Sequence, residues 1–581
     1  MPWLRQFWKE EDGVIVGFAV FLFMIILMIG GVGIDVMYSE MKRTRLQHTL
    51  DRAILAAADL DQTRDPQEVV EDYFEKAGMS DFLSTVVVTD GLNYRQVEAS
   101  ATTTHDTMFM RLVGVDTLTA PASGAAIERI GNIEISMVLD VSGSMNSNSR
   151  LANLKIAAND FVETMDENTE DGTLSISIVP YATQVSGPDE LFAELNVSDE
   201  HSYSNCIDFT ASDFNETGIS TTEGFERTMH FDPWNEHDYR DNDPSYPTGH
   251  SSDNSGDPVC ELQDNREMIV LQDDVTELQN FISAMWGGGN TSIDIGMKWG
   301  TALLDPDLQP AVTEMIANGD IPDSFEGRPY SHAEAESLKV IVLMTDGQNT
   351  SQYYIQDDFR DGPSNVWWNE QEEIYSVYVG QDEDDEDDDD ITDEPLFYWP
   401  GHWDPDGQWQ EGWYDHPWGN GTYESEEVVG QELECSSYKR NGSCRRYRWV
   451  DVVETTQIDE PGVAAVVSYP DLWAYTSPRW VADQLYAPWM GRDDARADWD
   501  DGVQGSYGNS AKNTRTENIC DAAKAEGIIV FTIGFEAPAD GQAILQDCAS
   551  SDSHYFDVNG LEIQDAFAAI ATSIRQLRLT Q

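Results

Sequence analysis

The hydrophobic pattern opens with an apolar run from Val14 to Ile34 that contains no charged residue. Its length is about that of a helix crossing a bilayer. A cleaved signal peptide is the competing interpretation, but the run is long for one and no small-x-small cleavage site follows it. We therefore expect a cytoplasmic segment over residues 1–12 and an uncleaved transmembrane anchor over 13–36. Basic and acidic residues flank the run, so charge alone does not set its orientation.

After the anchor, the pattern predicts a small α+β domain over residues 37–130. Apolar positions at helical spacing continue to about Leu60 and recur in a second segment. Alternating and β-branched stretches then predict strands. The expected helices are Ser39–Leu60, Pro66–Ala77 and Met108–Val113, and the expected strands are Thr85–Thr89, Gln96–Thr102 and Leu118–Ala125.

From Ile133 the pattern changes to short, continuous apolar runs separated by helical segments, which indicates buried strands of an α/β domain over 131–581. The expected strands are Ile133–Leu139, Leu174–Pro180, Leu338–Met344, Ile528–Gly534 and His554–Val558. The expected helices are Leu151–Met165, Val275–Met285, Ser292–Leu304, Thr514–Glu526, Asp540–Cys548 and Leu561–Leu579. Alternating strands and helices predict a mostly parallel, doubly wound sheet with helices on both faces.

Two long stretches with little periodicity, at about 186–265 and 351–510, interrupt this pattern and are predicted to be insertions. Seven tryptophans crowd the second one: Trp367, Trp368, Trp399, Trp403, Trp409, Trp413 and Trp418. They could form the core of an inserted subdomain, which we favour, or a surface that binds glycans or a partner protein. The acidic run Asp382–Asp390 is expected to be a solvated loop.

Charge restricts the possible partners. With 33 Lys+Arg against 107 Asp+Glu, the formal net charge is −74. Such a surface repels nucleic acid and anionic lipid headgroups and favours cations. It is compatible with a saline habitat and equally with simple solubility of an exported protein.

All six cysteines lie C-terminal to the anchor, and an even number suits disulfides in an oxidising compartment. They show neither CxxC nor Cys/His spacing, so a zinc site is not expected. Six cysteines allow 15 connectivities. Among them we expect pairing of sequence neighbours: Cys206–Cys260, Cys435–Cys444 and Cys520–Cys548.

The chemistry of the chain centres on Asp140-Val141-Ser142-Gly143-Ser144, directly after the first buried strand. This spacing puts one carboxylate and two hydroxyls on one tight loop. Thr291 follows three glycines and begins a helix, and Asp346 follows another buried strand. Ligands of open α/β sheets gather at the carboxyl ends of the strands, so the three loops can converge. Hard oxygen ligands suit Mg²⁺, Ca²⁺ or Mn²⁺.

A D-x-S-x-S sequence alone is more often a capped turn than a metal site. Together with Thr291 and Asp346, however, it resembles the metal-ion-dependent adhesion site (MIDAS) of the von Willebrand factor A (VWA) domain. The resemblance implies that Ser142, Ser144 and one further group bind the ion directly, and that the other groups often act through water. It also implies an open metal position, which a carboxylate from a partner protein fills. The adjacent Ser292 leaves open which hydroxyl is the ligand on the second loop.

The N-terminal segment resembles the TadE/TadG-like anchor of tight-adherence (Flp) pilus systems. The matching residues are Gly13–Val16, the apolar run, Gly33-Ile34-Asp35 and the helix through Leu46-Gln47 to Ala56-Ala57-Ala58. The resemblance implies a single-pass protein of a bacterial inner membrane, whose body is periplasmic or at the cell surface and supports pilus assembly. Prepilin-type precursors carry Glu five residues after the cleavage glycine, where this chain has Phe18. We therefore expect a permanent tether and not a polymerising pilin.

The chain contains no G-x-S-x-G, H-E-x-x-H or phosphate-binding loop, so we do not expect an enzyme. The predicted function is metal-dependent binding of a protein partner, among pilus-assembly or surface components. Two alternatives stay open. One is a calcium-stabilised surface or matrix protein, and the other is an adhesin that binds carbohydrate through its Trp-rich insertion.

Overall fold

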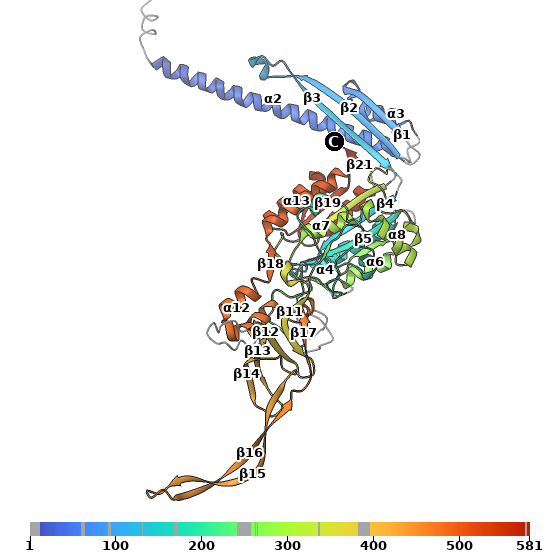
Figure 1. The fold of residues 1–581 in the computed structure, drawn as a ribbon. Coiled ribbons are helices and arrows are strands. Elements are labelled where there is room, and N and C mark those ends of the chain that lie inside the picture. The colour runs from blue at the N-terminus through green and yellow to red at the C-terminus, as the bar shows by residue number, and fades with distance from the viewer. Residues whose placement is uncertain are drawn as a thin grey trace, which may run out of the picture.

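The computed structural model describes residues 12–59, 64–90, 94–129, 132–167, 169, 172–240, 257–261, 263, 265–334, 337–381, 395–575 and 578–580. Figure 1 shows three parts in a row. The long helix α2 and a small domain lie at one end, a sheet covered by helices lies in the middle, and a lobe with a long hairpin lies at the other end.

Helix α2 (Asp12–Ala58) is one helix of 47 residues. It joins the predicted anchor and the helix predicted after it without a break. Its apolar first half is long and hydrophobic enough to cross a membrane, and only 6% of the most apolar window is buried inside the molecule. Large apolar side chains are exposed along this half of the helix, as is typical of a helix that spans a bilayer; Phe18, for example, is 63% exposed.

The second half of α2 packs on the small domain. The sheet of this domain has the order β1 (Leu83–Asp90), β2 (Tyr94–Asp106), β3 (Thr117–Arg129) and β21 (Arg578–Thr580). Its core includes Leu50 and Ile54 from α2 and Phe74 from α3 (Pro66–Lys76). The fourth strand comes from the other end of the chain. The helix predicted over Leu561–Leu579 therefore extends too far, because α15 (Glu562–Arg575) ends before this strand.

Asp35 joins α2 to the small domain. Its carboxylate accepts the backbone N–H groups of Met108 at 3.0 Å, Phe109 at 2.7 Å and Met110 at 2.7 Å. These groups lie at the start of the short helix η2 (Met110–Val113), so the Asp35 side chain caps this helix. The close packing of α2 against Phe109 requires glycine at position 31, since a Cβ there would lie 2.5 Å from the Phe109 ring.

The central sheet has six strands in the order β20 (Tyr555–Val558), β19 (Ile529–Phe535), β9 (Ser337–Thr345), β4 (Asn132–Asp140), β5 (Leu174–Tyr181) and β8 (Ile269–Gln272). All neighbours are parallel except β5 and β8. Residues of α4 (Arg150–Glu167), α6 (Val275–Ala284) and α15 share a core on one face. Residues of α7 (Ile293–Ala302), α8 (Gln309–Asn318), α13 (Asn509–Ala525) and α14 (Ala539–Cys548) share a core on the other. The predicted α/β class is confirmed, whereas the domain limits and the assignment to the VWA fold stay predictions.

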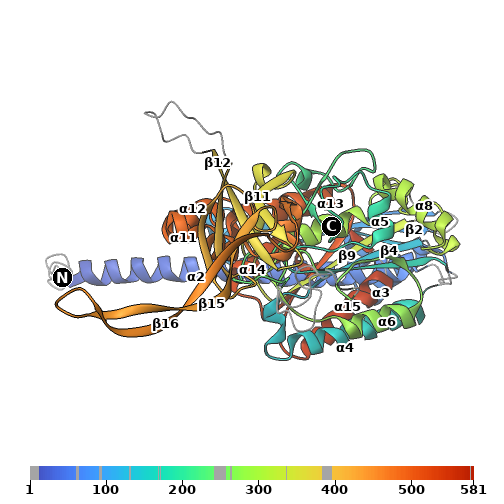
Figure 2. The ribbon, with the colours of Figure 1, turned by 60° about the horizontal axis from the view of Figure 1, so that its bottom comes forward.

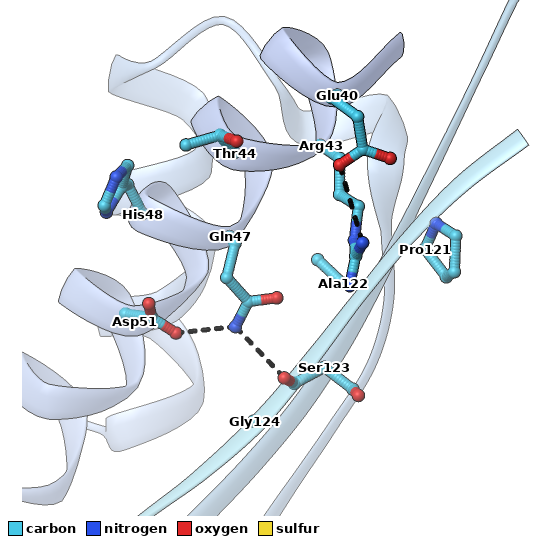
Figure 3. Close-up of a pocket in the computed structure, with 10 residues that line it drawn as sticks. All are labelled: Glu40, Arg43, Thr44, Gln47, His48, Asp51, Pro121, Ala122, Ser123 and Gly124. Atoms are coloured by element: carbon cyan, nitrogen blue, oxygen red, sulfur yellow. Dashed lines mark hydrogen bonds and ion pairs between the residues drawn. The ribbon is translucent and has the colours of Figure 1, made fainter. Parts of the chain in front are cut away.

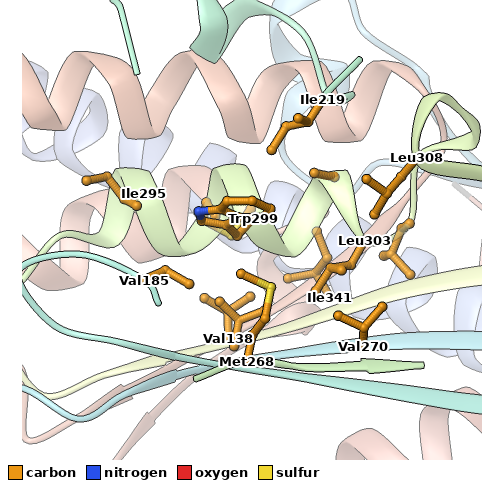
Figure 4. Close-up of a cluster of buried hydrophobic side chains, with 14 of the residues drawn as sticks. Val138, Val185, Ile219, Met268, Val270, Ile295, Trp299, Leu303, Leu308 and Ile341 are labelled. Atoms are coloured by element: carbon orange, nitrogen blue, oxygen red, sulfur yellow. The ribbon is translucent and has the colours of Figure 1, made fainter. Parts of the chain in front are cut away.

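The strands are mostly apolar because both of their faces are buried. Val138 and Ile341 point to the core around Trp299 of α7 (Figure 4), whereas their neighbours Met137 and Val342 point to the other core. Helix α7 lies very close to the sheet, since a Cβ at Gly300 would lie 2.4 Å from the Val138 side chain.

The first insertion is shared between two cores. Leu191, Phe209 and Phe225 pack in the core around Trp299, and the later part of the insertion joins the second insertion in the lobe seen in Figures 1 and 2. Its main sheet is antiparallel, in the order β14 (Trp409–Tyr414), β13 (Pro395–Trp403), β12 (Ile374–Gln381), β11 (Pro363–Asn369) and β17 (Ala464–Ser468). Met229 and Phe231 of the first insertion share one core with Val366 and Trp473 of the second. The acidic run Asp382–Asp390 lies outside the described residues.

The tryptophans of the second insertion divide into buried and exposed side chains. Trp399 and Trp418 are 2% and 0% exposed and form a small core with Phe397. Trp403, Trp409 and Trp413 are exposed. The insertion therefore has its own aromatic core and a separate aromatic surface.

The structure contains three disulfides, Cys206–Cys260, Cys435–Cys444 and Cys520–Cys548, which are the pairs of sequence neighbours. The first closes a loop of the first insertion and the second closes the tip of the long hairpin. The third ties α13 to α14.

Replacing Asp35 with Ala is expected to loosen the joint between α2 and the small domain. The change removes the acceptor of three backbone N–H groups, which costs about 1–2 kcal/mol. Limited proteolysis of the full chain in detergent should then cut faster within residues 107–114. Glu40→Ala, at an exposed site on the same helix, is the control and should leave the cleavage rate unchanged.

Candidate metal centre

The register of two neighbouring strands determines where the loops of the candidate centre lie. Strands β4 and β9 are parallel, with Leu139 opposite Met344, so the residues that end them lie side by side. Thr345 donates its hydroxyl to Asp140 Oδ2 at 2.6 Å. The pairing thus brings the Asp140 loop and the Asp346 loop to one edge of the sheet.

A chain of short hydrogen bonds connects four predicted ligands. The Ser142 N–H donates to Asp140 Oδ1 at 2.8 Å, and the hydroxyls of Ser142 and Ser144 are 3.0 Å apart. Ser144 donates its hydroxyl to Asp346 Oδ1 at 2.6 Å, across 202 positions of sequence. Four predicted ligands therefore share one small volume.

The second loop packs against the first through its glycines. The Gly143 N–H donates to Gly289 O at 3.0 Å, and the Gly288 N–H donates to Val141 O at 2.9 Å. Gly289 has φ +75°, in the left-handed region that favours glycine. The glycine run thus lets the backbone approach closely and sets the position of Thr291.

The structure distinguishes Thr291 from Ser292. The Ser292 hydroxyl donates to Thr183 O at 2.7 Å and contacts Lys512 Nζ, so it is engaged away from the other ligands. Thr291 Oγ1 lies 4.0 Å from where a Cβ of Gly347 would be, beside the Asp346 loop. Thr291 is therefore the better placed of the two hydroxyls.

Burial makes the site electrostatically costly without a cation. Asp140 is fully buried, and its burial together with the Asp346 carboxylate raises the pKa of Asp140 to about 6. Hydrogen bonds from Thr345 and Ser142 oppose this shift. Two carboxylates and three hydroxyls form an oxygen-only donor set, which fits Mg²⁺, Ca²⁺ or Mn²⁺. Within the described residues there is no group of three or more His, Cys, Asp or Glu side chains that could hold a metal, so an ion here would depend on the hydroxyls.

Arg150 is a part of the site that the sequence analysis missed. Its Nη1 donates to Asp346 Oδ2 at 2.6 Å, and its Nε donates to Glu536 Oε2 at 3.0 Å. It lies in the first turn of α4, six residues after Ser144, and its side chain is 15% exposed. The guanidinium supplies one positive charge beside the carboxylates and competes with any cation for Asp346.

Lys512 supports the second and third loops from behind and was also missed. Its ammonium group donates to Thr291 O at 2.9 Å, Thr350 O at 2.8 Å and Ser292 Oγ at 2.5 Å. Burial lowers its pKa to about 8, against the attraction of Asp294 at 3.8 Å. Lys512 lies on α13, soon after the second insertion ends, so it links that insertion to the predicted ligand loops.

A groove of about 530 Å³ lies elsewhere, between α2 and β3 of the small domain (Figure 3). Gln47 crosses it, donating to Asp51 at 2.7 Å and to Ser123 O at 3.1 Å, and Arg43 pairs with Glu40 at 3.5 Å. These polar groups bind one another along the helix–sheet contact. The groove contains none of the predicted ligands.

Sequence comparison identifies only the N-terminal part of the chain. Residues 13–60 match the family model described as putative Flp pilus-assembly TadE/G-like. This match covers α2 and carries the resemblance noted above, but it does not reach the body that holds the candidate site. No curated protein matches the chain.

Solved structures give distant similarities. The von Willebrand factor domain of the type V pili tip protein Mfa5 from Porphyromonas gingivalis is 14% identical, with 77% of this chain and 95% of that chain covered and a TM-score of 0.29. The adhesive tip pilin GBS104 from Group B Streptococcus agalactiae is 11% identical (76% and 100% covered, TM-score 0.27). Proximal thread matrix protein 1 from the mussel byssus is 9% identical (78% and 47% covered, TM-score 0.25). At these TM-scores the similarities do not bear on the function of this chain.

Lys512→Met is expected to loosen the Thr291 and Thr350 loops. The change leaves two buried carbonyl groups and the Asp294 carboxylate without their ammonium partner, at a cost of about 3 kcal/mol. Hydrogen exchange followed by mass spectrometry should show faster exchange in 289–293 and 347–351.

The matched control is Lys524→Met on the same helix, whose ammonium binds Asp547 O and Asp521 near the surface. Equal exchange in the two variants would show that Lys512 does not position these loops.

Proposed function

We propose that this chain is a membrane-tethered VWA protein that binds a protein partner through one divalent cation, in pilus assembly or surface attachment. Residues Asp140, Ser142, Ser144, Thr291 and Asp346 hold the ion. The body is held in the periplasm or at the cell surface of a bacterium by α2. The activity is recognition and not catalysis.

The observation that carries this proposal is the link from Ser142 through Ser144 to Asp346. The Ser144 hydroxyl lies 3.0 Å from the Ser142 hydroxyl and 2.6 Å from Asp346 Oδ1, although Ser144 and Asp346 are 202 residues apart in sequence. A capped turn would explain Asp140 and Ser142 alone, but it gives no reason for Ser144 to reach Asp346. The TadE/G-like match of residues 13–60 supports the pilus context.

A cation held mainly by hydroxyls keeps a strong attraction for further negative charge, because its first ligands are mostly neutral. A carboxylate of a partner protein meets that need. The bound ion supplies Lewis acidity and an exchangeable position. The chain supplies the orientation of the ligands, through Thr345 on Asp140 and Lys512 behind Thr291.

The exposed tryptophans support a second candidate function. Trp403 and Trp409 pack edge to face at 5.2 Å on the outer hairpin of the lobe, and Trp409 donates to Glu411 at 3.0 Å. Aromatic faces beside carboxylates suit sugar rings. Glycan binding that survives Asp140→Ala would favour this function over the metal-dependent one.

Saturating Mg²⁺ or Ca²⁺ is expected to stabilise the full chain in detergent, and Asp346→Ala is expected to abolish the effect. A ligand at 100 times its Kd contributes about 2.7 kcal/mol to the free energy of unfolding. Isothermal titration with each ion, together with thermal unfolding with and without chelator, measures the gain. Partner capture on wild-type protein should be lost with the chelator and with Asp346→Ala.

Asp305→Asn is the control, because Asp305 binds Thr217 and His332 beside the amino ends of the strands. If chelation lowers the stability but leaves capture unchanged, the ion is structural and the recognition role is wrong.

Arg150→Gln is expected to strengthen metal binding. The change removes the positive charge that now binds the buried Asp346 carboxylate, which then lacks this counter-charge unless an ion is bound, so the Kd for the ion should fall by about fivefold or more. Titration with Mg²⁺ or Ca²⁺ tests it. Weaker metal binding in this variant would show that Arg150 holds Asp346 in place for the ion and does not compete with it.

A further inference from the structure

The turn between β2 and β3, residues 107–116, lies against the apolar half of α2. Asp35 accepts three backbone N–H groups of this turn, and the Phe109 ring packs directly on Gly31. Figure 1 shows β2 and β3 running beside α2 to this contact. The turn is therefore held at the level of residues 31–35 of the helix.

That level lies at the end of the predicted membrane span. The apolar run Val14–Ile34 is about 30 Å long at about 1.5 Å per residue, which is the thickness of the hydrocarbon core of a bilayer. All of the run is needed to cross, so Gly31 lies about 5 Å inside its last residue. Since Phe109 contacts Gly31, the turn reaches the boundary between the hydrocarbon core and the headgroups.

The rest of the β2–β3 hairpin extends away from the bilayer. Gln47 lies about 18 Å further along α2 than Asp35, and it donates to Ser123 O of β3 at 3.1 Å. Strand β3 covers about 20 Å between Ser123 and its first residue, Thr117. Helix and strand thus keep pace with each other, and the turn is the part of this hairpin nearest the membrane.

The surface of the turn is apolar. Residues 107–115 contain one basic residue, Arg111, and no acidic one, although the formal net charge of the chain is −74. Asp106 and Asp116 flank this stretch on either side. Three large apolar side chains of the turn are exposed: Met108 (69%), Leu112 (71%) and Val113 (51%). An exposed apolar patch with a polar rim indicates a contact surface.

We propose that the turn 107–116 inserts into the interface of the bilayer that α2 spans and forms a second membrane contact. Met108, Leu112 and Val113 pack among the first acyl carbons, and Arg111 extends to the lipid phosphates. The flanking aspartates stay in water and keep the insertion shallow. The proposal rests on the membrane tether of the proposed function and is independent of its metal site.

The depth of the turn selects lipid as the occupant. Asp35 and Gly31 hold the turn against α2 at the level where that helix leaves the hydrocarbon core, so lipid surrounds the turn without any further partner. A single helix can tilt and rotate within a bilayer. A second contact on one side of α2 restricts both motions, and it thereby fixes how the small domain stands on the membrane.

Spin labels on single added cysteines measure the depth of the turn. All six native cysteines form disulfides, so an added cysteine is labelled alone. The full chain is placed in nanodiscs of phosphatidylethanolamine and phosphatidylglycerol. The measured quantity is the ratio of collisions with oxygen, which is enriched in lipid, to collisions with a water-soluble nickel chelate. This ratio should be several times higher at Leu112→Cys than at Val87→Cys.

Val87 is the matched control because it is also apolar and 52% exposed in the same domain. It lies opposite Glu98, which lies opposite Ala125, beyond the level of Gln47. Phe23→Cys, within the apolar run, reports on α2 itself. A lipid signal at Phe23 with a water signal at Leu112 would overturn this proposal and leave the tether intact. A water signal at Phe23 would remove the tether as well.

Charge on the turn tests whether lipid covers it. In the Leu112→Cys background, Met108→Glu with Val113→Glu should lower the collision ratio to near the Val87 value, because two carboxylates oppose insertion. Met108→Leu with Val113→Ile is the control and should keep the ratio of the parent. All of these side chains are exposed, so the core of the domain is unchanged. A ratio that stays high with both glutamates would show that protein packing shields the turn, and the lipid contact would be wrong.

Discussion

The in-register parallel pairing of β4 with β9 is the constraint on which the candidate site depends. It aligns Leu139 with Met344, so that Asp140 meets Thr345 at the sheet edge. Successive side chains of each strand are buried alternately in the core on one face of the sheet and in the core on the other. A shift of the register by one residue would move every side chain of the strand into the wrong core, so the packing stabilises this pairing. The relative positions of the polar side chains at the sheet edge are thus determined by apolar packing within the sheet.

That polar site is held from three directions. Thr345 orients Asp140 from the strand, Arg150 binds Asp346 from α4, and Lys512 holds the backbone behind Thr291 from α13. Arg150 and Lys512 act on different parts of the site. Arg150 lies on the side of the carboxylates and lowers their mutual repulsion, whereas Lys512 is fully buried and acts on the loop backbone. The cost of burying Lys512 is offset by three hydrogen bonds and the nearby Asp294.

Sequence reasoning predicted the sheet well because buried parallel strands are continuous apolar runs, and Ile133–Leu139 and Leu338–Met344 stand out as such. It selected the five candidate ligands because they lie at or just after the end of a strand, or just before a helix, and their binding of an ion stays a prediction. It missed Arg150 and Lys512, since a lone basic residue on a helix has no local signal and its partner is distant in sequence. It also missed β8 and β21, which are short edge strands of four and three residues. The two insertions also pack on each other, with Phe231 and Trp473 in one core. Residues so far apart in sequence leave no periodic pattern from which this packing could be predicted.

The return of the chain to the small domain has a mechanical consequence. Strand β3 leads into the central body, and β21 comes back from it and pairs with β3 at Ile127 and Ala126. The end of β3 and the start of β21 therefore lie at the same end of this sheet. A pull on the body away from α2 would act along the strands and shear the ladder between β2 and β3, which are 13 residues each. Hydrogen bonds loaded in shear must break together, whereas bonds that are peeled break one at a time, so the β2–β3 ladder would resist such a pull as a unit.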